Sequence, residues 1–565
     1  MISNRSNTFP RVLLPWALAA IVLGALFRFT GLGHRDFWFD ESCTFIFVHN
    51  LFAWDSLSNL LIESTNLPYY FLLRVWTILF GESEWAYRSF SACCATAAIP
   101  LTGWLGWQLA GRRVAVITML IAGFHPLHIY YAHEARAYAM WTMVIVLCLN
   151  LVVRAVRLGT RRGWAAYALT LYVCLHLHYF TVFLVPSLAC AALFGNNRRQ
   201  SLLQWCAATG LTCVAFIPYI LVAVLPAGRG GGSAWIADNF DPVTAIPRTI
   251  WAFMPSGGYP VHLKGLSVAS YDTLVRQSPV LVALCAALPS LLAVALLVRV
   301  VMRHRKRMAR AGQSPDNTEQ PNRYASDSTL FLLATTVIPL LLPLLYSIVI
   351  RPVYLPARYD LVAWPSFIVL LAALLDAAFP IRSTNTGFVD RYGTAVATCM
   401  MLACSLLPIA RMRGAVPESS FHQARAKALA RQAEDGSLAI TFSYDWEFLA
   451  FYLQRAGYSG ELLAFPTWLN HQIGWLDHED DFRKLQRGEV DENAHAVSTF
   501  LGEQLSKGTT VFVLGDSLTL KGGPGRTAVN HPLIDRLSAA PFNATIIDRQ
   551  FLIWRLTRAD SSDDK

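Results

Sequence analysis

The sequence predicts a mainly α protein that crosses a membrane about eleven times and carries a small α/β domain outside it. Hydrophobic residues make up 54% of its 565 residues and charged residues only 15%, and the mean hydropathy is +0.39. Soluble proteins average about 25% charged residues, so this composition excludes a disordered chain, a fibrous chain and an ordinary soluble enzyme. Apolar runs of membrane-spanning length continue up to residue 410, and a more polar sequence with short β-like runs follows.

The apolar runs define the predicted transmembrane helices. They lie near 12–31, 88–109, 114–131, 137–156, 164–180, 181–196, 203–225, 278–300, 328–350, 359–379 and 392–410. The first run follows a short basic tail, and no small-residue cleavage site comes after it, so we interpret it as a retained helix rather than a signal peptide. The two short runs between 164 and 196 can also be interpreted as one broken segment.

Basic residues predict the orientation of these helices. When the runs are counted in order, the arginine-rich connections after runs two, four, six, eight and ten all lie on the side of the N-terminus. Lys and Arg favour the cytoplasmic side of a membrane, so we expect the N-terminus inside the cell and the C-terminus outside. The net charge of +10 then reflects topology and does not indicate a nucleic-acid partner. The polar connection 311–327 is expected to be a flexible inside loop.

The chain therefore divides into two predicted domains. Residues 1–410 form the membrane domain, with outer loops at 32–87 and 226–277, and residues 411–565 form the α/β domain outside the membrane. The β-like runs of the second domain are 438–443, 509–515 and 544–557, and 419–433 is expected to be helical. The 11 cysteines lie almost all in apolar runs and provide neither a disulfide framework nor a metal-binding ribbon.

Four polar clusters lie on the predicted outer side. They contribute Asp40 and Glu41 after run one, His133, Glu134, Arg136 and Tyr138 between runs three and four, His176 and His178 at the end of run five, and Arg358 and Tyr359 before run ten. Taken singly, each cluster has a structural interpretation, such as a helix cap or an arginine that reaches lipid headgroups. Together they supply an arginine fork for phosphate and a carboxylate that can accept a proton from a hydroxyl group. Their convergence predicts an active site for an anionic substrate with a lipid tail.

The histidines leave metal binding open. His176 and His178 are two positions apart and do not share a helical face, so they can bind one ion only if the helix unwinds there. A histidine in such a place more often makes ordinary hydrogen bonds.

These clusters resemble the motifs of bacterial membrane glycosyltransferases of the GT-C class, in particular glycosyltransferase family 39, which includes protein O-mannosyltransferase-like and aminoarabinose-transferase-like enzymes. The likeness covers about 12–370. It rests on FWFDES around Asp40-Glu41, NLPYYFLLRVWTILFGESEWAYRSFSA at 66–92, HIYYAHEARAYAM at 128–140, LHLHYF at 175–180 and YLPARYDLVAWPSFIVLL at 354–371. The chain departs from the family at Asn66-Leu67-Pro68, where the family usually has His-Pro-Pro.

The resemblance implies transfer of a sugar from a polyprenyl-phosphate donor to an envelope acceptor, which is a protein, a lipid or a polysaccharide. It implies a multi-pass protein of the bacterial plasma membrane, reaction on the extracytoplasmic face and inversion at the anomeric carbon. Asp40 would be the general base, and Glu41 would support it or bind acceptor or metal. The donor phosphate and lipid would be held by Arg136, Tyr138, Arg358 and Tyr359. Substrate positioning, or a divalent ion, would fall to His133, Glu134, His176 and His178.

Three other functions are compatible with parts of this pattern. A transporter or flippase of a lipid-linked sugar would also be polytopic, but transporters place their ionisable groups near the bilayer midplane, whereas these lie at the ends of the runs. A ligase or polymerase would differ from a single-sugar transferase only in the length of its donor. An envelope scaffold would use the α/β domain as its binding part and would need no chemistry at Asp40.

Overall fold

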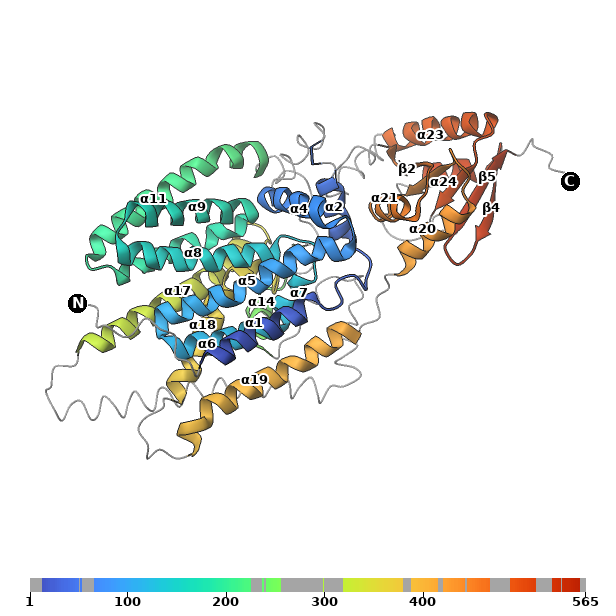
Figure 1. Cartoon of the computed structure of the whole chain (residues 1–565). Coiled ribbons are helices and arrows are strands. Elements are labelled where there is room, and N and C mark those ends of the chain that lie inside the picture. Colours follow the sequence, from blue (N-terminus) through green and yellow to red (C-terminus); the bar gives the residue numbers. More distant parts are fainter. Residues whose placement is uncertain are drawn as a thin grey trace.

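The computed structural model describes residues 13–49, 51–52, 66–224, 236–237, 240–255, 298, 319–379, 388–414, 420–442, 445–467, 488–514, 531–539 and 541–558. Helices up to residue 414 pack side by side in one bundle, and a small sheet with its own helices lies beyond one end of that bundle (Figure 1). This arrangement follows the predicted order of an apolar part followed by an α/β part.

The bundle is built from helices of very different lengths. The long ones are α1 (Leu14–Phe29), α5 (Glu84–Ala110), α8 (Tyr138–Leu158), α9 (Arg161–Leu177), α11 (Arg198–Tyr219), α17 (Glu319–Val349), α18 (Trp364–Ala378) and α19 (Phe388–Gly414). The shorter ones are α2 (Phe39–His49), α4 (Leu67–Phe80), α6 (Arg112–Gly123), α7 (Pro126–Ala132), η1 (Tyr179–Phe183), α10 (Val185–Leu188), η2 (Ala189–Phe194), η3 (Ile220–Val224), α14 (Ala245–Phe253) and η4 (Tyr359–Val362).

Some of these helices are suited to cross a membrane by length and composition. Within the described residues, three are long and apolar enough, namely Tyr138–Leu158, Arg198–Val222 and Ser326–Val349, and α6 with α7 forms a fourth that bends by 58° at its break. Apolar helices of 10–17 residues, including α1 and α18, add to these. The chain is thus a membrane protein, but the predicted number of eleven spans remains a prediction, since run eight at 278–300 lies almost wholly outside the described residues.

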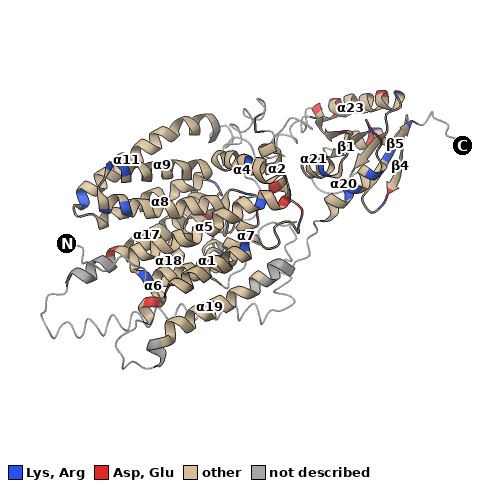
Figure 2. Ribbon diagram, viewed as in Figure 1, with Lys and Arg blue, Asp and Glu red and all other residues tan. Residues whose placement is uncertain are grey.

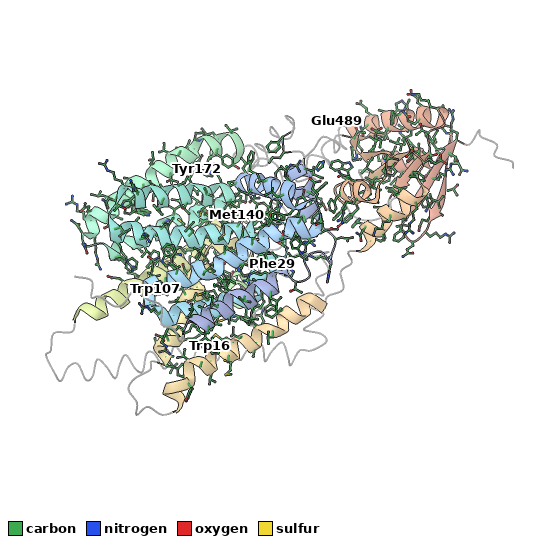
Figure 3. All side chains as sticks on the ribbon, in the orientation of Figure 1. Trp16, Phe29, Trp107, Met140, Tyr172 and Glu489 are labelled. Atoms are coloured by element: carbon green, nitrogen blue, oxygen red, sulfur yellow. The ribbon has the colours of Figure 1, made fainter. Side chains whose placement is uncertain are left out.

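The side chains of the bundle separate into an interior and an apolar exterior. Met140 of α8 is only 4% exposed, whereas Trp16 of α1 is 60% exposed and Trp107 of α5 is 40% exposed. Figure 3 labels these residues among the side chains that fill and surround the helices. Large apolar groups on the outside of a bundle are expected where lipid replaces water.

Two helices of the bundle begin at polar residues whose side chains cap the helix N-terminus. The hydroxyl of Ser83 accepts the N–H of Ala86 at the start of α5, and the side chain of Asn197 accepts the N–H of Gln200 at the start of α11. Such caps satisfy backbone donors that have no partner within the helix.

Basic residues gather at the end of the bundle that is far from the sheet. Arg112, Arg161 and Arg198 each begin a helix at that end, and Figure 2 shows Lys and Arg along these helix ends. The acids of α2 lie at the opposite end, near the sheet. The positions of these three arginines agree with the predicted distribution of basic loops, while the direction of the chain across the membrane stays a prediction.

Two of the predicted loops contain helical structure. Helix α14 occupies part of the outer loop 226–277, and the rest of that loop lies mostly outside the described residues. Helix α17 begins at Glu319, so the connection predicted to be flexible over 311–327 is helical in its second part. An apolar run starting near 328 can extend backwards through Glu, Gln and Arg because these residues also favour helices.

The first outer loop carries helix α4, which is apolar on both its buried and its exposed face. Helix α4 buries Tyr69, Tyr70 and Leu73 against the bundle. Its other face exposes apolar side chains, namely Phe71, Leu72, Val75, Ile78, Leu79 and Phe80. An exposed apolar face beside a membrane bundle is typical of a helix that rests in the bilayer surface. Residues 53–65 of this stretch lie outside the described residues.

The C-terminal part folds around a five-stranded mixed sheet with strand order β2-β1-β3-β5-β4. Its elements are α20 (Ser420–Gln432), β1 (Leu438–Phe442), α21 (Asp445–Ala456), β2 (Glu461–Phe465), α23 (Glu489–Ser506), β3 (Val511–Leu514), α24 (His531–Leu537), β4 (Phe542–Asp548) and β5 (Ile553–Arg558). Strand β1 pairs in parallel with both β2 and β3, and β5 pairs antiparallel with β3 and β4. The β-like run predicted at 544–557 is therefore a hairpin of two strands.

The sheet domain contacts the bundle through α21. The hydroxyl of Tyr452 accepts the N–H of Phe37 at 2.8 Å, and the ring of Phe451 lies 4.7 Å from the rings of both Phe37 and Phe45. These aromatic contacts lie directly beside α2, which carries the predicted acids. The α/β domain thus helps to position this end of the bundle.

Candidate active site

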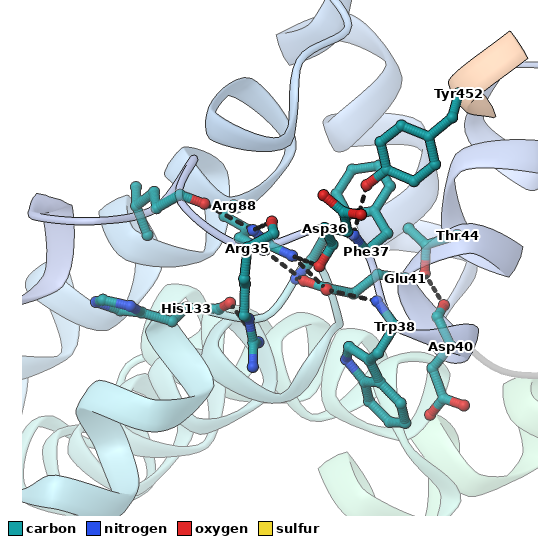
Figure 4. A network of polar contacts seen from close by, with 12 residues as sticks. Arg35, Asp36, Phe37, Trp38, Asp40, Glu41, Thr44, Arg88, His133 and Tyr452 are labelled. Atoms are coloured by element: carbon teal, nitrogen blue, oxygen red, sulfur yellow. Dashed lines mark hydrogen bonds and ion pairs between the residues drawn. The ribbon is translucent and has the colours of Figure 1, made fainter. Parts of the chain in front are cut away.

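Asp40 is buried in the first turn of α2 between two arginines. Its Oδ2 lies 2.7 Å from Nη2 of Arg358 and 3.7 Å from Nη2 of Arg136, and the residue is 2% exposed. Its backbone carbonyl accepts hydrogen bonds from Thr44 at 2.9 Å and from Nη1 of Arg136 at 3.4 Å. The side chain points away from that of Glu41 (Figure 4). The structure therefore brings together Asp40, Arg136 and Arg358, which come from three distant parts of the sequence.

Arg358 is held by aromatic groups as well as by Asp40. Its Nε donates to the hydroxyl of Tyr138 at 2.6 Å. Its guanidinium lies 5.3 Å from the ring centre of Tyr138 and 5.8 Å from those of Trp38 and Tyr359. Such cation–π contacts orient a guanidinium and allow its burial. Both predicted tyrosines thus lie beside the arginine to which the resemblance assigns the donor phosphate.

The cluster holds two guanidinium groups in its interior. Arg136 and Arg358 are both buried, and Asp40 forms an ion pair with each of them. Charge-assisted hydrogen bonds from arginine are among the strongest contacts that a protein offers to an anion. A phosphate suits such a cluster because it accepts the parallel N–H groups of an arginine fork.

Glu41 makes a different set of contacts from its neighbour. Its Oε1 accepts Nε of Arg88 at 2.8 Å and the N–H of Ala135 at 2.8 Å, and its Oε2 accepts Nη2 of Arg88 at 2.6 Å. Burial alone would raise the pKa of Glu41, but the charge of Arg88 outweighs it and holds this pKa below its ordinary value. Both carboxylate oxygens of Glu41 thus bond to Arg88 or to the backbone. Any support that Glu41 gives to Asp40 is therefore indirect.

Arg88 is the centre of the first outer loop. Besides Glu41, it donates to the backbone carbonyls of Leu32, Arg35 and Asp36 at 2.7–2.8 Å. The loop before α2 therefore folds around one buried guanidinium (Figure 4). Arg88 has no role among those predicted from the sequence, although an arginine at the start of an apolar run is a signal of a specific role.

Glu134 lies in the turn between α7 and α8, close to the arginines. It is 2% exposed, and burial raises its pKa to about 7, although Arg35 and a hydrogen bond with Tyr130 act in the opposite direction. Near neutral pH this carboxyl group can exist in both protonation states. The structure thus places Glu134 beside the site as a group able to hold or release a proton.

The three predicted histidines lie in three different environments. His178 is stacked on Trp141 with ring centres 4.4 Å apart and lies 4.9 Å from the ring of Tyr359. His133 pairs through Nε2 with the carbonyl of Phe27 at 3.1 Å. His176 bonds to the carbonyl of its own helical turn and packs among other aromatic rings. Only His178 of these three shares the surroundings of Arg358, so His176 and His178 do not form a common site.

The carboxylates that would bind a divalent ion are occupied by arginines. Asp40 pairs with Arg358, and Glu41 pairs with Arg88. Within the described parts of the chain, no group of three His, Cys, Asp or Glu side chains is arranged to hold a metal ion. The described residues therefore do not fit a metal site.

Comparison with known proteins identifies the fold. No family model and no curated protein matches the sequence. Among solved structures, ArnT from Cupriavidus metallidurans in the apo state has 13% sequence identity and a TM-score of 0.54, covering 96% of this chain and 98% of its own. The same protein bound to undecaprenyl phosphate has 12% identity and a TM-score of 0.52, covering 97% and 98%. The apo oligosaccharyltransferase of Archaeoglobus fulgidus has 13% identity and a TM-score of 0.50, covering 91% and 70%. The chain thus has the fold of the GT-C glycosyltransferases, the class that its sequence motifs resemble.

Proposed function

We propose that the protein is a membrane glycosyltransferase that moves a sugar from a polyprenyl-phosphate donor to an acceptor on the outer face of the bacterial plasma membrane. The observation that carries this proposal is the burial of Asp40 between Arg136 and Arg358 at one end of an apolar bundle. The shared fold supports it, since a solved structure of that fold contains undecaprenyl phosphate.

In the proposed donor complex the two arginines bind the phosphate. Arg358 leaves or shares its contact with Asp40 and forms a fork on the phosphate oxygens, while Tyr138 and Tyr359 stay against its guanidinium. The polyprenyl tail lies along the apolar exterior of the bundle. As the bond to the sugar breaks, negative charge grows on the phosphate, and preorganised cations stabilise it.

Asp40 is the proposed general base. An acceptor hydroxyl attacks the anomeric carbon, a new C–O bond forms on the face opposite the phosphate, and the bond between carbon and phosphate oxygen breaks. The hydroxyl proton passes to the carboxylate of Asp40, and the polyprenyl phosphate leaves with the bonding electrons. One displacement of this kind inverts the anomeric carbon.

The other predicted residues have supporting roles in this proposal. Glu41 positions Asp40 indirectly by fixing the start of α2 through Arg88, whose guanidinium also binds the preceding loop. Glu134 and His178 line the surroundings of the arginines and contact donor or acceptor. His133 links its turn to α1 through the carbonyl of Phe27, and His176 bonds within its own helix.

A transporter fits the geometry less well. The buried charges of α2 lie at the end of the bundle that faces the sheet domain (Figure 2), whereas a transport site is expected near the middle of the membrane. The acceptor is proposed to be an envelope protein, lipid or polysaccharide, and no nucleic-acid partner is proposed.

The test is sugar transfer by the purified full chain in lipid nanodiscs. Radiolabelled polyprenyl-phosphate mannose, aminoarabinose, galactose and arabinose would be offered with a crude envelope fraction as acceptor. We expect turnover of one donor, with inversion in the product. Arg136→Lys and Arg358→Lys should raise the donor KM about ten-fold or more because a bidentate contact is lost.

A matched control is available at the other end of the bundle. Arg113 pairs with Asp376 at 3.0 Å in a partly exposed contact, so Arg113→Lys should leave the donor KM unchanged. Absence of turnover with every donor, from protein shown to be folded, would contradict the proposal. Movement of the labelled lipid across a vesicle membrane would then favour the transporter.

A further inference from the structure

A second buried network surrounds the segment that carries Arg358. Oδ2 of Asp360 accepts the N–H of Ala357 at 2.8 Å and also the hydroxyl of Thr249. The hydroxyl of Thr249 is 2.7 Å from that of Tyr354. Thr249 has one hydroxyl proton, which goes to the carboxylate, so Tyr354 donates to Thr249. These three side chains are fully buried, and we call them the Asp360 network.

The Asp360 network holds Ala357 in an unusual backbone conformation. Ala357 has φ of +62°, a region that costs a residue with a Cβ atom about 1–2 kcal/mol. Its N–H donates to Asp360, and its carbonyl accepts the hydroxyl of Tyr131 at 2.6 Å. Both polar groups of this peptide segment are therefore fixed by side chains, which is what a strained conformation needs in order to persist.

The consequence falls on the next residue. Arg358 follows Ala357 directly, and its guanidinium reaches Asp40 at 2.7 Å and Tyr138 at 2.6 Å. If Ala357 relaxed to an ordinary negative φ, the chain would leave Ala357 in another direction. The guanidinium of Arg358 would then no longer reach Asp40 and Tyr138. Since Thr249 lies in α14, the outer loop 226–277 is linked to the same arginine.

We propose that Asp360 is a positioning residue for the donor phosphate: with Thr249 it holds Ala357 at positive φ, so that Arg358 faces the phosphate before the donor arrives. This inference rests on the proposed function, because it assigns the phosphate to Arg358. It goes beyond that function by making donor affinity depend on a buried carboxylate and an outer-loop hydroxyl that do not touch the phosphate.

The experiment measures the affinity of the purified full chain for undecaprenyl phosphate, with thermal unfolding as a check of folding. Asp360→Ala should weaken binding about ten-fold or more, since Arg358 is no longer preoriented. Adding Ala357→Gly to Asp360→Ala should restore part of the affinity, because glycine adopts positive φ without a Cβ penalty. A general loss of packing would not be repaired by removing a methyl group.

A pair of threonines provides the matched control. Thr249→Val removes the hydroxyl that links α14 to Asp360, and we expect it to weaken binding about three-fold to ten-fold. Thr335 is also buried in a helix, but its hydroxyl bonds to carbonyls of its own helix, at Phe331 and Leu332. Thr335→Val should therefore bind like the wild type.

The outcomes separate the two proposals. Wild-type affinity in Asp360→Ala would overturn the role of Asp360 and leave the proposed function intact. Weak binding in Asp360→Ala that Ala357→Gly does not improve would overturn the conformational explanation. A wild-type chain that is folded but binds no undecaprenyl phosphate would overturn the proposed function together with this inference.

Discussion

Two adjacent acids, Asp40 and Glu41, have different tasks because their side chains leave α2 in different directions (Figure 4). Asp40 faces the two arginines of the candidate site, and Glu41 faces Arg88 and the N–H of Ala135. The first pair is proposed for chemistry, and the second holds the loop. Substitution of Asp40 should therefore lower the rate of transfer, whereas substitution of Glu41 should lower the stability of the fold.

Glu41→Gln should lower the free energy of unfolding, because it breaks the buried ion pair with Arg88. Removing one partner of a buried ion pair leaves the other charge uncompensated and costs about 3–5 kcal/mol. Thermal unfolding in detergent would measure this loss. Asp376→Asn is the control, because its pair with Arg113 is partly exposed and should be worth less than about 1 kcal/mol. Equal unfolding temperatures for the two variants would show that the Glu41–Arg88 pair does not support the loop.

Glu134 makes stability depend on pH. Burial raises its pKa to about 7 in the folded protein, while the unfolded chain keeps a pKa near 4.5. The folded state thus binds more protons between these values, and stability falls as pH rises from about 4.5 to 7 and is constant above. Glu134→Gln removes the penalty, so it should stabilise the protein by up to about 3 kcal/mol at pH 8 and by little at pH 4.5. Unfolding temperatures across this range would measure it, and a pH-independent difference would contradict the assignment.

At the residue scale, the sequence predicted the chemical types of the site but not their pairing. Asp40, Arg136, Tyr138, Arg358 and Tyr359 were expected on one side of the membrane, and the structure brings them together. Arg88 and Thr249 were missed, because their roles depend on partners that are distant in sequence. A single sequence shows which groups reach the same end of a bundle but not which of them touch.

At the scale of elements, the contact between α2 and α21 joins the bundle to the C-terminal part. The N–H of Phe37 donates to the hydroxyl of Tyr452 across this contact. Tyr452→Phe leaves that buried donor unpaired, which should cost about 1–3 kcal/mol and speed amide exchange in residues 37–45. Tyr458→Phe is the control, because its hydroxyl bonds to carbonyls within the C-terminal part. Faster exchange at 37–45 in both variants, or in neither, would contradict a specific contact.

The crossing of α1 and α6 depends on a glycine. A Cβ atom added at Gly123 would lie 2.8 Å from the backbone oxygen of Ala20, so Gly123→Ala forces the helices apart. We expect a loss of about 1–3 kcal/mol from this overpacking. At Gly210 of α11, no described atom beyond its chain neighbours and the nearby backbone of its own helix lies within 4 Å of such a Cβ, so Gly210→Ala should be neutral or stabilise by up to about 1 kcal/mol. Thermal unfolding of both variants measures the contrast, and equal effects would contradict the close crossing.

The sequence predicted the presence of helices and strands better than the residues at which they begin and end. Apolar runs identify most helices of the bundle, but α5 begins at Glu84 and α17 at Glu319, because polar helix-forming residues extend a helix beyond its apolar part. In the C-terminal part the run 544–557 reads as one strand, whereas the structure has a hairpin. Strand order follows from contacts between distant segments, so no local pattern could predict it.

At the scale of the whole molecule, the two ends of the bundle differ in where their arginines lie. At the end far from the sheet, arginines begin helices α6, α9 and α11, whereas the arginines of the candidate site are buried at the end where α2 meets the sheet (Figures 1 and 2). Donor and acceptor would thus meet at one membrane surface, where lipid reaches the apolar helices and water reaches the sheet domain. The sequence predicted this division from composition and the positions of arginines alone.

Asp40 is proposed to act as the base, and the two arginines are proposed to bind the donor phosphate. Undecaprenyl-phosphate binding and sugar transfer, measured in the same preparations of wild type and Asp40→Asn, separate these two roles. In the free protein Asp40 competes with the phosphate for Arg358, at 2.7 Å. Asp40→Asn should therefore bind the lipid at least as tightly as wild type, while its transfer rate falls by about 10²–10⁴. Transfer at the wild-type rate in Asp40→Asn, with binding unchanged, would contradict the assignment of the base.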